Sequence, residues 1–296
     1  MGENRVLAVI GMHRSGTSLL TNILDSMGVH VGDEAKIMVD QYNERGYWEN
    51  LQMITINDAI LHYFGSTWSE PWGLTPSNIK RHPTIRALAP HIKDLLARYQ
   101  DYDMWAFKDP RATLTMPFWD PFLPTVDYFI SVRNPLAVAH SLKHRDNLSI
   151  TEGAMLWYFY TISALYNTEH KHRMLVFYEA HFDSQTRDQQ ALKIAQFIGD
   201  VTNPLQGLSP IDESLKHHDP SLEDLLRHSE VPPMVKTLYQ KLVDGDLNVL
   251  EFDFPELFAA FDQTVSWTRF ILGRARFRRR VELLKSKRLL KRVELI

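Results

Sequence analysis

The sequence contains no cysteine, which excludes disulfides, thiolate zinc sites and cysteine nucleophiles. A reducing or redox-indifferent compartment is therefore expected. No apolar run is long enough to cross a bilayer, and no charged leader with a long apolar segment stands before the first short apolar run. These absences predict a soluble, cytoplasmic protein. The 296 residues, 44% of them hydrophobic, suffice for a substantial core.

Charge is nearly balanced over the whole chain but not along it. The formal net charge is −3, while residues 274–296 hold ten Lys and Arg against two Glu. This tail carries +8, so the rest of the chain carries −11. The basic stretch 274–292 suits a membrane surface or a polyanion as partner, and a solvated amphipathic helix explains the pattern equally well. No nucleic-acid partner is predicted.

A glycine-framed loop at residues 11–18 (GMHRSGTS) follows an apolar run at 5–10 and precedes apolar residues at helical spacing over 17–27. Strand, loop and helix in that order form the context of a phosphate-binding P-loop. The lysine that normally follows the second glycine is replaced by Thr17. Arg14 is the loop's cation, and an arginine can bind anionic oxygens. The loop predicts a phosphate-like ligand other than Mg-ATP; a plain strand-to-helix turn is the alternative.

Short apolar strands alternate with helices through the first two thirds of the chain. Strands are predicted at 5–10, 104–107, 128–132 and 174–178, and helices at 17–27, 51–64, 84–99, 136–144, 151–166 and 189–198. This alternation predicts a P-loop-like, three-layer α/β/α fold with a central parallel sheet and a helical C-terminal extension. We expect one α/β domain over residues 1–262, with irregular or helical insertions at about 29–100 and 200–262, and a basic helical tail at 263–296.

Polar residues follow each predicted strand, where the carboxyl ends of parallel strands meet and ligands bind. They are the 11–18 loop, Lys108-Asp109, Arg133-Asn134 and Tyr178-Glu179. A kinase needs an aspartate at the end of a second strand to hold Mg²⁺. Residues 128–132 are followed by Arg133 instead. Metal-dependent phosphoryl transfer therefore lacks two of its parts, and no metal site is predicted.

Together these segments resemble the PAPS-dependent sulfotransferases, from about residue 6 to residue 199 and in the expected order. The resemblance rests on the 11–18 loop, on Arg133-Asn134-Pro135 with Ser141 eight residues after the arginine, and on VFYE at 176–179 followed by QFIG at 196–199. The chain looks most similar to the bacterial-type branch, whose loop reads His-Arg-Ser-Gly-Thr-Ser. That branch also carries the segments found here at 46–50 (GYWEN) and 108–111 (KDPR).

The resemblance implies transfer of a sulfonate from the co-substrate PAPS (3′-phosphoadenosine 5′-phosphosulfate) to a glycan, lipid or small-metabolite acceptor, with release of PAP and without a metal. Arg133 and Ser141 would bind the 3′-phosphate, and Tyr178 would approach the adenine. The 5′-phosphosulfate would be bound by the loop residues His13, Arg14, Ser15, Gly16, Thr17 and Ser18. A P-loop phosphotransferase and a non-catalytic binding module are the alternatives.

The catalytic cation is expected to be Arg14, which would stabilise the charge that develops on the oxygen bridging sulfur and phosphorus. Similar enzymes generally have a lysine at this place, so electrostatic stabilisation is expected of Arg14 rather than proton donation. Lys108, which follows a strand at the same edge, is expected to add a second cation near the sulfonate.

A general base must take the proton of the acceptor hydroxyl. Glu49, at the junction of a loop and a helix, is the first candidate. Asp109 is the second, although it could instead pair with Arg111 or Lys108 and orient them. Glu34 and His13 follow. The acceptor pocket could be lined by Trp119, Trp157 and the tryptophans at 68 and 72, or these could pack in the core.

Overall fold

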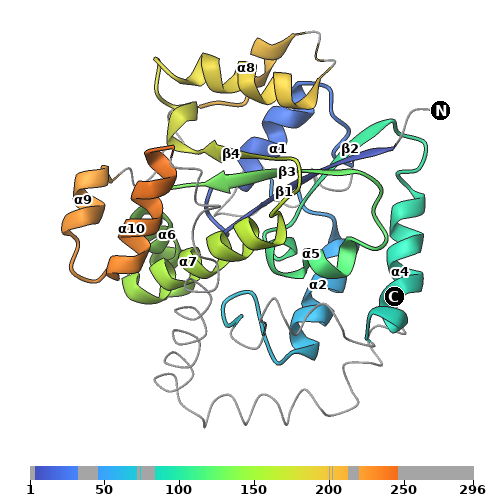
Figure 1. The fold of residues 1–296 in the computed structure, drawn as a ribbon, viewed down its shortest axis with the longest axis horizontal. Helices are drawn as coiled ribbons and strands as arrows, with labels where there is room; N and C mark the ends of the chain where they lie inside the picture. The colour runs from blue at the N-terminus through green and yellow to red at the C-terminus, as the bar shows by residue number, and fades with distance from the viewer. Residues whose placement is uncertain are drawn as a thin grey trace.

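The computed structural model describes residues 4–32, 46–71, 74, 84–199, 201, 203–212 and 220–245. The central sheet consists of β1 (Arg5–Gly11), β2 (Met104–Lys108), β3 (Val126–Val132) and β4 (Arg173–Phe177). The strands are all parallel and lie in the order β2-β1-β3-β4 (Figure 1). The chain passes from β1 to β2 on one side and then to β3 on the other, so the order reverses at the carboxyl end of β1. Open parallel sheets bind their ligands at such a point.

Helices connect and follow the strands. Before β2 lie α1 (Thr17–Ser26), α2 (Leu51–Tyr63) and α4 (Thr84–Ala97). Between β2 and β4 lie α5 (Ala112–Trp119), α6 (Pro135–Asp146) and α7 (Ile150–Asn167). After β4 come η2 (Glu179–His181), α8 (Arg187–Ile198), η3 (Pro204–Leu208), α9 (Leu222–Arg227) and α10 (Pro233–Val243).

The sheet is covered on both faces, because successive side chains of a strand point to opposite sides. In β1, Leu7 and Val9 pack in one buried cluster with residues of α1 and α8. Val6, Ala8 and Ile10 belong to the larger cluster, with residues of α2, α5, α6 and α7. Figure 1 shows α1 and α8 on one side of the sheet and α5 and α7 on the other. The predicted three-layer α/β/α fold is confirmed.

Helices α5 and α7 show two ways in which the structure departs from the helix predictions. Helix α5 was not predicted, because Pro117 interrupts its sequence pattern and seven of its eight residues are buried, which leaves no polar face to mark it. Helix α7 begins earlier than the predicted residue 151. Its N-cap is Ser149, whose side chain accepts from the backbone N–H of Glu152 while the Glu152 carboxylate accepts from the backbone of Ser149. This reciprocal capping box fixes the start of the helix.

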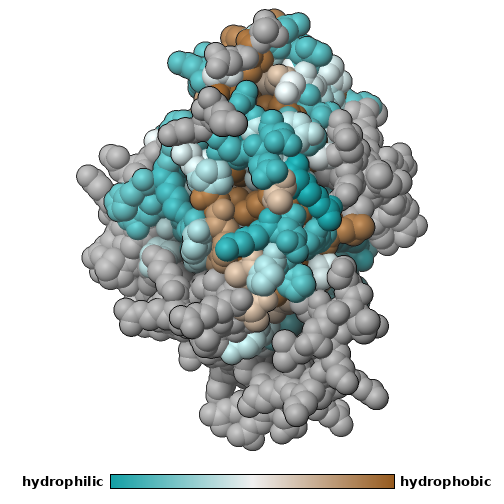
Figure 2. All heavy atoms as spheres, turned by 90° about the vertical axis from the view of Figure 1, so that its right-hand side faces the viewer, coloured by the Kyte–Doolittle hydropathy of each residue, from teal (hydrophilic) through white to brown (hydrophobic). Residues whose placement is uncertain are grey.

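Several sequence predictions lie outside the described residues: the basic tail at 263–296 with its stretch 274–292, Glu34 and Trp72. In the part of the chain that the structure describes, no helix is long and apolar enough to cross a membrane. Figure 2 shows the face on the right-hand side of Figure 1, where apolar residues gather near the middle and hydrophilic ones surround them.

Candidate functional site

The glycine-framed loop lies at the carboxyl end of β1, as predicted. The hydroxyl of Thr113 contacts both the backbone N–H (2.9 Å) and the carbonyl oxygen (3.1 Å) of Gly11, and the hydroxyl of Ser131 donates to the carbonyl of Ser15 at 2.7 Å. Both glycines have positive φ, 137° at Gly11 and 91° at Gly16. A Cβ on Gly11 would lie 2.5 Å from the Ser131 carbonyl oxygen, and one on Gly16 would collide with the Tyr178 ring. Close backbone approach therefore requires glycine at both positions.

Four predicted ligand-binding side chains meet around this loop. Arg14, at φ 67°, donates from Nε to the hydroxyl of Ser141 at 2.8 Å. Arg133 donates from Nη1 to the carbonyl of Arg14 at 3.1 Å, and its guanidinium carbon lies 4.3 Å from the ring centre of Tyr178. Burial lowers the pKa of Arg14, and repulsion from Arg145 and Arg133 adds to this. Such crowding of cations favours a bound anion.

The loop itself fits a phosphate-like group. Ser15 is fully buried, and its hydroxyl has no hydrogen-bond partner among the described residues. Buried hydroxyls nearly always have one. Thr17 and Ser18 open helix α1, whose N-terminal N–H groups favour anions. Ser18 also donates to the carbonyl of Tyr47 at 3.2 Å. A buried hydroxyl without a partner, a helix N-terminus and a nearby guanidinium form a complete cradle for an anionic oxygen group.

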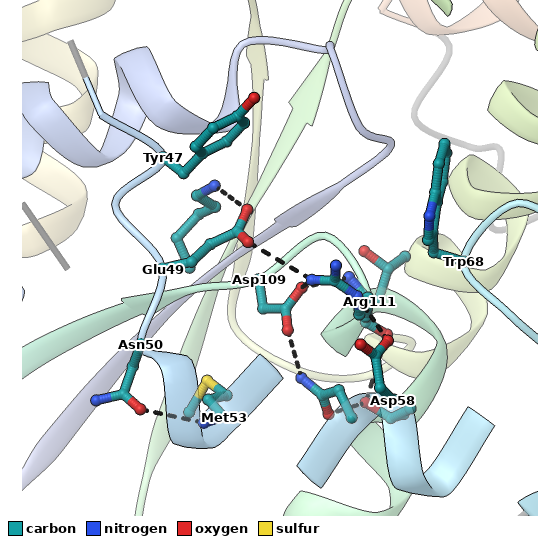
Figure 3. Close-up of polar contacts among 12 residues, drawn as sticks. Tyr47, Glu49, Asn50, Met53, Asp58, Trp68, Asp109 and Arg111 are labelled. Carbon is teal, nitrogen blue, oxygen red and sulfur yellow. Dashed lines mark hydrogen bonds and ion pairs between the residues drawn. The ribbon is translucent and has the colours of Figure 1, made fainter. Parts of the chain in front are cut away.

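Lys108 and Glu49 form a buried ion pair beside the loop (Figure 3). Lys108 Nζ lies 2.5 Å from Glu49 Oε1, and the two residues are 2% and 5% exposed. Burial lowers the pKa of Lys108, while attraction to Glu49 opposes that change. The other carboxylate oxygen, Oε2, lies 3.5 Å from Nη1 of Arg111. Both oxygens of Glu49 thus face cations.

Arg111 links three carboxylates (Figure 3). Besides Glu49, it reaches Oδ1 of Asp109 at 3.1 Å through Nη1 and Oδ1 of Asp58 at 2.9 Å through Nε. Although burial opposes it, the three carboxylates raise the pKa of Arg111. Burial also raises the pKa of Asp58. Arg111 is therefore a permanent cation that ties the end of β2 to helix α2.

Asp109 is fully buried and is held by hydrogen bonds on both oxygens. Oδ1 accepts from the backbone N–H of Arg111 at 2.9 Å, and Oδ2 accepts from the side-chain amide of Asn57 at 2.9 Å. The amide oxygen of Asn57 in turn accepts from Thr115 at 2.6 Å and from the indole of Trp119 at 2.8 Å. This arrangement is the alternative the sequence left open for Asp109, in which it orients the neighbouring cation.

His13 is 8% exposed and packs against aromatic rings. Its ring centre lies 4.7 Å from that of Trp68 and 5.9 Å from that of Tyr160. Burial, followed by repulsion from surrounding cations, lowers the pKa of His13 well below 6.5. The imidazole is therefore neutral at neutral pH.

The tryptophans divide between core and site. Trp119 and Trp157 are fully buried in the larger core cluster. Trp68 is partly exposed, and Arg145 lies with its guanidinium carbon 5.1 Å from the Trp68 ring centre. Of these three, Trp68 packs against His13 and Arg145, and Trp119 reaches the polar cluster only through its hydrogen bond to Asn57.

No group of three or more His, Asp or Glu side chains that could hold a metal ion is found among the described residues. Metal independence stays a prediction. The same is true of each role assigned to a site residue, although the structure brings most of these side chains to one edge of the sheet.

A profile of the sulfotransferase family matches residues 7–199, well over half of the chain. The chain belongs to the sulfotransferase family. Its fold and sulfotransferase membership do not favour a phosphotransferase. Among curated proteins, none matches this sulfotransferase at a significant level. Among solved structures it is similar to the sulfotransferase domain of the Synechococcus PCC 7002 olefin synthase, with 17% identity and a TM-score of 0.46 over 79% of this chain and 86% of that one.

Three parts of this sulfotransferase site were not found from the sequence: Asn57, Asp58 and Arg145. Asn57 carried a usable signal, because it is a polar residue within the buried stripe of α2 formed by Met53, Ile56 and Ile60. Arg145 lies one helical turn after Ser141 on α6, so it shares a helix face with a predicted ligand. Asp58 had no comparable signal, since its partner Arg111 is distant in sequence.

Proposed function

We propose that this chain transfers the sulfonate of PAPS to a hydroxyl or amine of a glycan, lipid or small-metabolite acceptor and releases PAP. The observation that carries this proposal is the meeting of Arg14, Ser141 and Arg133 at the carboxyl ends of β1 and β3. PAPS carries two separate anionic groups, the 5′-phosphosulfate and the 3′-phosphate, and this cluster offers a cation for each. We propose the cytoplasm as its location, in keeping with the absence of cysteine.

In this proposal Arg14 and the loop hold the 5′-phosphosulfate, while Arg133 and Ser141 hold the 3′-phosphate. Tyr178, which lies beside Gly16 and under Arg133, is the proposed neighbour of the adenine. The donor supplies an activated sulfonate, so the protein has to bind, orient and stabilise charge rather than form a covalent bond itself.

Arg14 and Lys108 are the proposed catalytic cations. Both lie at the carboxyl edge of the sheet, one after β1 and one at the end of β2. Burial makes their charges effective, because interactions between charges strengthen when water is excluded. Glu49 holds Lys108 in place, and Asp109 does the same for Arg111. On the sequence argument both carboxylates also remain proposed candidates for the general base.

Incubation with PAPS and a metabolite or glycan extract, followed by mass spectrometry, tests the activity. We expect products that gain one sulfonate, and we expect Arg14→Ala to abolish them. The matched control is Arg98→Ala, which removes an exposed arginine after α4. Formation of phosphorylated products instead would overturn the proposal.

Calorimetric titration with PAP tests the donor separately from the acceptor. PAP should bind equally well with and without EDTA, and ATP with Mg²⁺ should bind more weakly than PAP. The resemblance assigns Arg133 to the 3′-phosphate, so Arg133→Ala should reduce this preference for PAP. Failure of PAP to bind to the wild-type protein would refute the proposed donor.

A further inference from the structure

His13 is a buried imidazole beside the proposed catalytic arginine whose Nε2 finds no hydrogen-bond partner among the described residues. Buried polar atoms of native proteins are nearly all hydrogen-bonded, and each exception calls for an explanation. His13 directly precedes Arg14 in the 11–18 loop, and Arg14 is one of the cations that repel a charge on its ring. A substrate atom is the natural partner for this nitrogen.

Packing rather than hydrogen bonding holds the imidazole in place. The Trp68 ring is tilted by 50° to it, and Tyr160 meets it edge-on at 76°. The Tyr160 hydroxyl donates to the backbone carbonyl of Trp68 at 2.8 Å, which ties the two aromatic residues together. The ring of His13 is thus oriented by its neighbours, while Nε2 has no hydrogen-bond partner in the part of the chain that the structure describes.

Four cations repel a positive charge on His13. Arg14 comes from its own loop, Lys108 and Arg111 from the end of β2, and Arg145 from α6. Tyr160 of α7 and the uncharged Trp68 complete the surroundings. These cations and burial keep the imidazole neutral, so a nitrogen lone pair is available. Negative charge bound beside Arg14 offsets the repulsion, and His13 becomes a stronger base in the donor complex.

The two carboxylates in the cluster are less available. Glu49 faces Lys108 with one oxygen and Arg111 with the other. Asp109 accepts hydrogen bonds on both oxygens and has no exposed surface. Both carboxylates are thus already engaged by donors of the protein, whereas Nε2 of His13 has no hydrogen-bond partner among the described residues.

We infer that His13 accepts the proton of the acceptor hydroxyl during sulfonate transfer. This inference rests on the proposed function. The acceptor oxygen forms the new bond to sulfur, while the bond from sulfur to the bridging phosphate oxygen breaks and leaves its electron pair on that oxygen. The hydroxyl proton moves to Nε2 of His13. General-base catalysis of this kind raises the reaction rate by about 10²- to 10⁴-fold.

The test compares His13→Gln, which keeps an amide near the place of Nε2 but cannot take up a proton, with Glu49→Gln. Phenol and p-nitrophenol serve as acceptor probes with PAPS. We expect His13→Gln to lower kcat/KM about 100-fold for phenol and less than about 10-fold for the more acidic p-nitrophenol, which needs a base less. The inference would be overturned if His13→Gln lowered kcat/KM equally for both phenols. It would also be overturned if only Glu49→Gln showed a larger loss with phenol than with p-nitrophenol.

Two further measurements do not depend on the folding of the His13→Gln variant, and the second does not depend on turnover. Added imidazole should restore phenol turnover to His13→Ala, and a lack of rescue with retained PAP binding counts against the inference. In an NMR titration, the pKa of the His13 ring should rise when PAP binds. An unchanged pKa in the PAP complex refutes the inference, whereas PAP that does not bind at all refutes the proposed function instead.

Discussion

At the amino ends of the strands Arg5 and Asp127 form an ion pair, and at the carboxyl ends Lys108 and Glu49 form another. Both members of the first pair have further partners in the protein. Asp127 also contacts His172 Nδ1 at 2.8 Å. Arg5 donates to the last carbonyls of α8, at Phe197 (2.9 Å) and Ile198. Arg5, Asp127 and His172 each therefore have a partner of opposite sign or a carbonyl.

At the carboxyl end, some polar groups have no such partner among the described residues. Around the Lys108–Glu49 pair lie the cations Arg14, Arg111, Arg133 and Arg145 and the carboxylates of Asp58 and Asp109. Nε2 of His13 and the hydroxyl of Ser15 lie there too, and neither has a hydrogen-bond partner in the part of the chain that the structure describes. The comparison teaches that a buried ion pair alone does not mark a site. Buried polar atoms that have no hydrogen-bond partner among the described residues, and that lie beside several cations, separate the reactive end of this sheet from its structural end.

Lys108→Met should give the largest effect, because it leaves the buried Glu49 with only the more distant Arg111. Breaking a buried pair destabilises a protein by about 3–5 kcal/mol, measured here as the free energy of unfolding in urea. The double variant Lys108→Met with Glu49→Met should recover part of this loss. Lys93→Met, which removes an exposed lysine of α4, is the control. Additive losses in the double variant would mean that the two residues do not act as a pair.

Arg14→Ala should act on turnover rather than on stability. Loss of one preorganised group that stabilises developing charge lowers kcat by about 10²- to 10³-fold, measured as release of PAP from PAPS. Arg14→Lys should retain more activity than Arg14→Ala, since a cation remains. A change in PAP release of less than about threefold in Arg14→Ala would remove the functional distinction between the two ends of the sheet.

The carboxyl end should also be the acid-sensitive one. Burial lowers the pKa of His181, in η2, to about 4. Between pH 6.5 and 4 the unfolded chain takes up a proton that the folded protein does not bind. The contribution of His181 to the free energy of unfolding is therefore complete above pH 6.5 and is lost as the pH falls. Near pH 4 the loss amounts to roughly 3 kcal/mol. His181→Gln should weaken this pH dependence of urea unfolding, and the exposed His172→Gln at the amino end should not. Identical pH profiles for both variants would contradict the assignment.

Asp127→Asn should have the smallest effect. It leaves Arg5 and His172 without their carboxylate, but Arg5 is partly exposed and keeps its bonds to α8. Loss of hydrogen bonds to a charged group costs about 1.5–3 kcal/mol, again measured by urea unfolding. Turnover should stay within about twofold of wild type, since no proposed ligand site lies at this end of the sheet. A loss of turnover with unchanged stability would contradict the structural role.

Most strands and helices were predictable because their signals are local. The strand predicted at 104–107 is β2, which ends one residue later at Lys108. The helix predicted at 51–64 is α2, which ends one residue earlier at Tyr63. Where local signals conflict, prediction failed. Pro117 disrupts the pattern of α5, yet burial of nearly all of that helix stabilises it in the fold. The Ser149 capping box was a readable signal that placed the start of α7 one residue before the predicted one.

The sequence by itself determined that the glycine loop, Lys108 and Arg133 lie at one edge, because carboxyl ends of parallel strands coincide and each of these groups follows a strand. Only the tertiary structure decided how the charges pair. Glu49 and Lys108 are 59 positions apart, and Asn57 and Asp109 are 52 apart. Which of them meet depends on how α2 packs against the end of β2. Strand and helix periodicity is written into neighbouring residues, whereas the pairing of buried charges follows from packing between distant segments.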